Sequence, residues 1–153
     1  MKRKKYHIIT FGCQMNKADS ERTAAMLEQK GYKPTRDIKT ADLVLVNMCS
    51  VRQSAVDRVH GLARKFKELQ TTNYKLKTIL TGCVLKKDQK KLHQIFDEIR
   101  PGLYVTAETA NKPQPHITIS NGCNNFCTYC VVPFTRGNLV CRSHRDVIGE
   151  AKK

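Results

Sequence analysis

Six of the seven cysteines stand in two groups of three whose spacing could hold a metal ion or an iron–sulfur cluster. The denser group has C-x3-C-x2-C spacing and consists of Cys123, Cys127 and Cys130. Three thiolates this close can bind three irons of a [4Fe–4S] cluster and leave the fourth iron open to a substrate or cofactor. Zinc is the alternative, because one more ligand would complete a tetrahedral site. The residues that could supply this ligand are Cys141, His116 and His144.

The other three cysteines each follow a short run typical of a β-strand, and they are Cys13, Cys49 and Cys83. Parallel strands place their carboxyl ends at one edge of a sheet, where open α/β folds bind ligands. We therefore expect the three thiols to converge. Gly12 and Gly82 precede two of them and permit tight turns and a close approach of the backbone to a bulky ligand. The alternative is three buried cysteines that act as small apolar side chains.

The elements that must position these cysteines alternate between strand and helix. Continuously apolar or β-rich runs predict strands at residues 6–11, 42–47, 77–81 and 103–105. Apolar positions at helical spacing, with Gly31 as a C-cap, predict helices at residues 19–30, 51–69 and 88–99. This alternation is typical of an α/β fold, a three-layer domain in which helices cover the faces of a parallel sheet.

The composition changes after this first domain. Residues 107–115 are polar and contain Pro113 and Pro115, which predicts a linker between a domain at residues 1–106 and a segment at residues 116–153. A strand at residues 116–120 should lead into the C-x3-C-x2-C motif. The second segment is too short for a domain of typical size, so we expect it to be the beginning of a larger one.

The charge of the chain favours an anionic partner. The formal net charge is +15, from 28 basic and 13 acidic side chains, and most of the excess lies within residues 1–100. Such a field suits nucleic acid, although a solvated surface that keeps the protein soluble is the alternative. No apolar run approaches the roughly 20 residues of a membrane span, and no signal peptide is recognisable. We therefore expect a soluble protein of the cytoplasm. Thiols stay reduced in that compartment, so the cysteines are expected to serve metal or redox chemistry.

The chain resembles the N-terminal part of the radical S-adenosylmethionine (SAM) methylthiotransferases. The matching stretches include all six grouped cysteines and are residues 10–16, 19–21, 47–52, 81–83 and 122–137. The resemblance implies an α/β domain whose three cysteines hold an auxiliary [4Fe–4S] cluster. A radical-SAM partial TIM barrel that opens with C-x3-C-x2-C would follow. In this family a small RNA-binding barrel, the TRAM domain, ends the chain.

Within the family, residues 12–16 and 49–52 are most similar to the MiaB-type branch. That branch converts N6-(dimethylallyl)adenosine at tRNA position 37 to its 2-methylthio form. Other branches act on threonylcarbamoyl-adenosine in tRNA or on an aspartate of a ribosomal protein, and they are the alternatives.

The resemblance also assigns roles to residues. The auxiliary cluster would be held by Cys13, Cys49 and Cys83. The radical-SAM cluster, which binds SAM through its open iron, would be held by Cys123, Cys127 and Cys130. Tyr129 stands where the family places an aromatic ring against the SAM adenine, and Arg136 and Arg142 are candidates for contacts with RNA or SAM. The implied partners are tRNA and an electron donor such as a flavodoxin or ferredoxin, with no membrane.

Two departures from the family pattern qualify these expectations. The sequence lacks the later barrel strands and the TRAM domain, so we expect the chain to bind clusters without complete turnover unless a separate C-terminal half joins it. Cys141 stands where we expect a serine. It could be inert, or it could close the second cluster as a fourth ligand and make the protein an electron carrier. A zinc-stabilised RNA-binding module is the other non-catalytic alternative.

Overall fold

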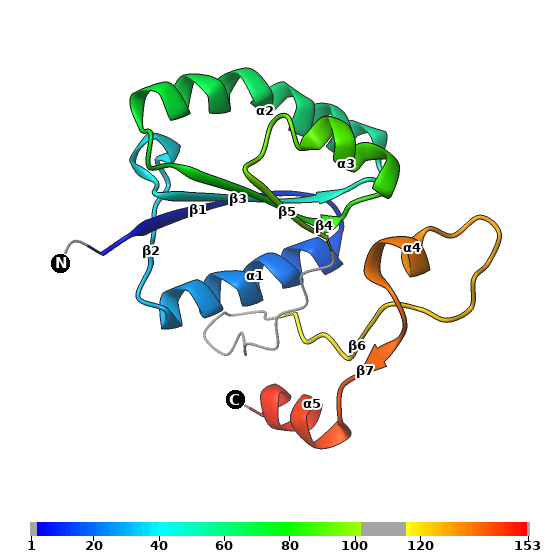
Figure 1. Ribbon diagram of the computed structural model, residues 1–153. Helices are drawn as coiled ribbons and strands as arrows, with labels where there is room; N and C mark the ends of the chain where they lie inside the picture. Colours follow the sequence, from blue (N-terminus) through cyan, green and yellow to red (C-terminus); the bar gives the residue numbers. More distant parts are fainter. Residues whose placement is uncertain (1–2, 102–115, 153) are drawn as a thin grey trace.

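Five parallel strands form the central sheet of the computed structural model, which describes residues 3–101 and 116–152 (Figure 1). The strands are β1 (Lys5–Phe11), β2 (Lys33–Pro34), β3 (Leu43–Cys49), β4 (Lys77–Cys83) and β5 (Glu98–Pro101). Their order in the sheet is β2-β1-β3-β4-β5, with every neighbouring pair parallel. This is the doubly wound order whose strand sequence reverses between β1 and β3.

Helices cover both faces of the sheet and make three layers. The helix α1 (Gln14–Gln29) lies on one face, while α2 (Gln53–Thr72) and α3 (Lys86–Leu92) lie on the other (Figure 1). A short 3₁₀ turn, Ile38–Thr40, precedes β3. The three-layer α/β architecture predicted from the sequence is therefore confirmed.

The main hydrophobic core lies between the sheet and the α2–α3 layer. All seven residues of β3 are buried, as its continuously apolar sequence predicts for a strand covered on both faces. The helix α2 contributes the buried side chains Val56, Val59 and Phe66 from its apolar stripe. The ring of Phe66 meets that of Phe96 edge to face, with centroids 5.5 Å apart. These contacts hold the helices against the sheet, and the first three cysteines lie at the carboxyl edge of that sheet.

Several boundaries differ from those that the sequence predicts. The strands β3 and β4 continue through Cys49 and Cys83, and α1 begins at Gln14, five residues before the predicted start. The predicted helix at 88–99 is wrong in its second half, because α3 ends at Leu92 and Glu98–Pro101 forms β5. The carboxylate of Asp97 accepts hydrogen bonds from the Thr78 amide (2.7 Å) and hydroxyl (2.8 Å), which draws the chain back to the sheet. The predicted strand at 103–105 and linker at 107–115 lie outside the described residues.

The second described segment forms a small unit beside the sheet edge. It contains β6 (Ser120–Asn121), α4 (Val132–Arg136), β7 (Val140–Cys141) and α5 (His144–Ala151), and β6 pairs antiparallel with β7. Only the end of the predicted strand at 116–120 is paired, because Thr118 and His116 instead contact Arg22 and Glu21 of α1. In the ribbon, α4 lies next to the carboxyl end of β4 (Figure 1). None of the helices in the described ranges combines the length and the apolar composition that a membrane span requires.

Candidate metal centre

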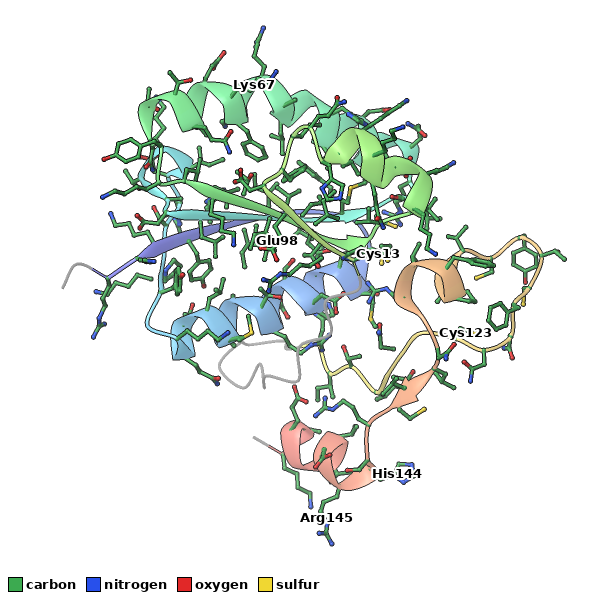
Figure 2. All side chains as sticks on the ribbon, in the orientation of Figure 1. Cys13, Lys67, Glu98, Cys123, His144 and Arg145 are labelled. Carbon is green, nitrogen blue, oxygen red and sulfur yellow. The ribbon has the colours of Figure 1, made fainter. Side chains whose placement is uncertain are left out.

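The first three cysteines line a single cavity at the carboxyl edge of the sheet. Cys49 and Cys83 are the last residues of β3 and β4 and are paired in register. Cys13 follows β1 by two residues and is the N-cap of α1, and Figure 2 shows it where the sheet meets this helix. The cavity has a volume of about 370 Å³. It lies at the reversal of strand order between β1 and β3, the place where such sheets bind ligands.

Two buried asparagines hold Cys13 in place. The side-chain oxygen of Asn16 accepts hydrogen bonds from the Cys13 amide (3.2 Å) and thiol (3.3 Å). Its Nδ2 donates to Asn47 Oδ1 (2.8 Å) and to the Met48 carbonyl (3.0 Å), so α1 is bonded to the end of β3. The sequence patterns assign neither asparagine a role, although Asn47, a polar residue inside the apolar run of β3, is a signal that could have identified it.

The glycine before Cys83 is required by close packing of the backbone. Gly82 has φ of +100°, and a Cβ atom there would collide with the Met48 carbonyl oxygen and the Asn47 side chain. A Cβ atom on Gly12 would likewise collide with the side chain of Asn16. The close approach expected at these glycines therefore occurs against the protein's own polar groups.

The thiols of Cys49 and Cys83 form a coupled pair. A hydrogen bond from Cys83, supported by the backbone N–H groups of Val51 and Arg52 near the start of α2, lowers the pKa of Cys49 to about 6. The pKa of Cys83 is raised because its proton is held by the Cys49 sulfur and because the thiol is buried. The pair thus releases one proton readily and the second with difficulty, and a thiolate is available at neutral pH.

An arginine from the second segment reaches this pair. Arg136 Nε donates to Cys83 Sγ at 3.0 Å, Nη1 donates to Asn121 Oδ1 at 3.0 Å, and Nη2 pairs with Asp19 Oδ2 at 2.8 Å. The Arg136 side chain is 7% exposed. The expected contact of Arg136 with RNA or SAM stays a prediction, and the structure places its guanidinium against the first cysteine group.

The second cysteine group lies in the loop before α4, with Cys123 labelled in Figure 2. Cys127 is exposed and the other two are half-buried. Gly122, directly before Cys123, lines the same cavity as the first three cysteines, as does Val132 of α4. Tyr129 is 88% exposed, so its ring is free to meet a ligand.

The remaining candidate ligands and contacts are dispersed. Cys141 lies exposed in β7, His144 is the first residue of α5, and His116 is hydrogen-bonded to Glu21 at 3.2 Å. Arg142 pairs with Glu150 and donates to the Thr118 carbonyl at 3.1 Å. Within residues 3–101 and 116–152, no three Cys, His, Asp or Glu side chains lie close enough together to hold a metal ion.

The chemistry of the first group nevertheless fits a thiolate-bound metal or cluster. Three sulfurs share one cavity whose wall includes apolar side chains such as Met15 and Val51, while Arg136 supplies a charged donor at Cys83. Buried thiolates with N–H donors aimed at sulfur are the environment in which proteins hold iron–sulfur clusters.

A family model described as "Uncharacterized protein family UPF0004" matches residues 5–101. Three relatives are named tRNA-2-methylthio-N(6)-dimethylallyladenosine synthase. The protein of Dictyoglomus thermophilum is 35% identical, with 97% of this chain and 41% of the relative covered. The protein of Thermoanaerobacter sp. (strain X514) is 36% identical, with 97% of this chain and 39% of the relative covered. The protein of Carboxydothermus hydrogenoformans is 33% identical, with 100% of this chain and 43% of the relative covered. The chain thus spans about two fifths of the length of these relatives.

The amide network at Cys13 generates a first prediction. Asn16→Ala removes the acceptor of the Cys13 amide and leaves Asn47 without its donor, so the free energy of unfolding should fall by about 1–3 kcal/mol. Urea unfolding of the reduced, metal-free chain measures it. Gln14→Ala, at an exposed position of the same helix, is the control and should change stability by less than about 0.5 kcal/mol. Equal effects of the two substitutions would contradict the role of Asn16.

The coupled thiols generate a second prediction. When the metal-free chain is titrated upward through about pH 6, the ultraviolet absorbance of one thiolate should appear, because Cys49 ionises there. Cys83→Ala removes the thiol that donates to Cys49 and should move this step toward the ordinary cysteine value of about 8.5. Cys141→Ala, at an exposed site, is the matched control and should leave the step in place. If the absorbance step of Cys83→Ala stays at the pH of the unsubstituted chain, the two thiols do not influence each other's ionisation.

Proposed function

Because the chain belongs to protein family UPF0004, we propose that it is the N-terminal part of a radical-SAM methylthiotransferase that modifies tRNA. The observation that carries this proposal is the cavity shared by Cys13, Cys49 and Cys83, whose wall includes the glycine that precedes the second cysteine group. The names of the relatives support N6-(dimethylallyl)adenosine as the substrate. Its C2–H bond has no acidic proton, so acid–base groups cannot open it and cofactor chemistry is required.

Each cysteine group is proposed to hold one [4Fe–4S] cluster. The auxiliary cluster would be bound by Cys13, Cys49 and Cys83, and the radical-SAM cluster by Cys123, Cys127 and Cys130. When bound, these groups supply the electron that cleaves SAM and the sulfur that is transferred. A flavodoxin or ferredoxin is the proposed source of electrons, and a separate C-terminal half could supply the rest of the barrel.

The residues of the chain itself would prepare this site. Asn16 orients Cys13, and the amides of Val51 and Arg52 in the turn before α2 favour the Cys49 thiolate that a cluster needs. Val51 and Val132 line the cavity from the two segments with apolar side chains. Tyr129, one residue before Cys130, presents an exposed ring that could stack on the adenine of SAM.

The charge of the helical layers supports an RNA substrate. The helices α2 and α3 together carry eight basic residues (Lys or Arg) and three acidic residues (Asp or Glu). The helix α1 carries two basic and three acidic residues. The basic side chains of α2 and α3 are exposed, and Figure 2 shows Lys67 pointing away from the sheet. Both helices begin near the sheet edge, directly after Cys49 and Cys83 and their short turns. A phosphate backbone held on this layer would lie beside the cavity.

The proposed activity is tested on tRNA from cells in which the gene for this chain is deleted. Mass spectrometry should show loss of the 2-methylthio mark and accumulation of N6-(dimethylallyl)adenosine. The intact gene and Cys141→Ser should restore the mark, whereas Cys49→Ser should not, because it removes a proposed cluster ligand. Persistence of the mark in the deletion strain would defeat the assignment, and loss of a threonylcarbamoyl-derived mark instead would move the protein to another branch.

The basic layer is tested by binding of the anticodon stem-loop. Replacing Lys90 and Lys91 of α3 by alanine should weaken binding roughly tenfold and lower the slope of log K against log salt by about 2, since two phosphate contacts are lost. The matched control replaces Lys17 and Lys30, which are exposed on or next to α1. Equal weakening by both pairs would mean that net charge alone, and not this layer, attracts the RNA.

A further inference from the structure

We propose that Arg136 is a positioning residue for the first cysteine group, and that its hydrogen bond to Cys83 raises the reduction potential of a cluster bound there. This rests on the proposed function, because it requires iron on the first three cysteines. Arg136 belongs to the second segment, six positions after Cys130, so the segment that carries one cysteine group would tune the cluster held by the other.

The guanidinium of Arg136 is held in one orientation by partners on three elements. Its donors reach the sulfur of Cys83 on β4 (3.0 Å), the amide oxygen of Asn121 on β6 (3.0 Å) and the carboxylate of Asp19 on α1 (2.8 Å). The planar guanidinium loses little freedom in making three bonds at once, and a lysine could not reproduce them. The Nε–H group is thereby aimed at the sulfur of Cys83.

The carboxylate that pairs with Arg136 also contacts a second guanidinium group. Asp19 Oδ2 faces Arg136, while Oδ1 binds Arg22 at 2.9 Å. The Asp19 and Arg136 side chains are both 7% exposed, and solvent therefore screens this ion pair weakly. The guanidinium also lies against the sulfur of Cys83, to which its Nε donates at 3.0 Å.

A positive donor at a ligand sulfur favours the reduced form of a cluster. Reduction adds one negative charge that is spread over iron and sulfur, and an N–H⁺···S bond stabilises the more negative state more strongly. Loss of the donor should lower the midpoint potential. Loss of the negative charge of Asp19 should raise the midpoint potential, because this charge offsets part of the positive charge that Arg136 places beside the sulfur. A purely structural role would not predict opposite signs.

The experiment uses the full chain with Cys123, Cys127 and Cys130 replaced by alanine, so that only the first cluster forms. After anaerobic reconstitution, EPR-monitored redox titration gives the midpoint potential and a chelator gives the rate of iron release. Arg136→Gln should lower the midpoint and release iron several-fold faster, and Arg136→Lys should recover part of the midpoint. Asp19→Asn keeps an acceptor oxygen and should raise the midpoint. Arg142→Gln, which removes the ion pair of Arg142 with Glu150 and does not alter a contact of the first cysteine group, should change neither.

The outcomes separate this proposal from the proposed function. If the parent binds no iron, the proposed function fails and Arg136 has no cluster to tune. If the parent holds a cluster whose midpoint is the same in Arg136→Gln, or if Arg136→Gln and Asp19→Asn shift it in the same direction, only the role of Arg136 is overturned. If Arg136→Gln does not fold by circular dichroism, the sign of the shift in Asp19→Asn decides, and a midpoint that falls or stays unchanged overturns the role.

Discussion

The parallel hydrogen-bonded register of β1, β3 and β4 is the constraint on which the rest of the structure depends. It pairs Phe11 with Met48 and Met48 with Gly82, so Cys49 and Cys83 form the next pair at this edge, and Cys13 follows Phe11 by two residues. Three cysteines far apart in the sequence therefore line one cavity. Because side chains alternate between the faces of a sheet, a shift of one residue in β3 or β4 would turn its cysteine away from the other.

Hydrogen bonds between buried polar groups then fix the positions of the cysteines more closely than the strand register does. The paired amides of Asn16 and Asn47 join α1 to β3 beneath Cys13, and Arg136 joins α4 to β4 and α1 beside Cys83. Burying any of these side chains without its hydrogen-bond partners would cost free energy, so the arrangement in which all the bonds are made is strongly favoured. The bonds of Arg136 also join the two described segments, so one side chain both stabilises this contact and donates to the Cys83 sulfur.

The distribution of charge gives the sheet two unlike faces. The layer of α2 and α3 is strongly basic and its helices begin beside the cavity, whereas α1 is close to neutral and packs against the second segment through Asp19 and Arg22. One face is thus suited to a polyanion and the other to a protein contact. In the proposed function, the adenosine would approach the cysteine edge while the phosphate backbone lies on the basic layer.

The sequence by itself determined the alternation of strands and helices, the position of each cysteine of the first group at the end of a strand, and the likeness to the methylthiotransferases. These features are local, since apolar periodicity and motif spacing are visible within a few residues. Tertiary structure alone decided that residues 98–101 form a strand, because the anchor of Asp97 to Thr78 joins positions 19 residues apart. It also decided the roles of Asn16 and Arg136: their partners Asn47 and Cys83 are distant in sequence, and only folding brings polar groups so far apart into hydrogen-bonding distance.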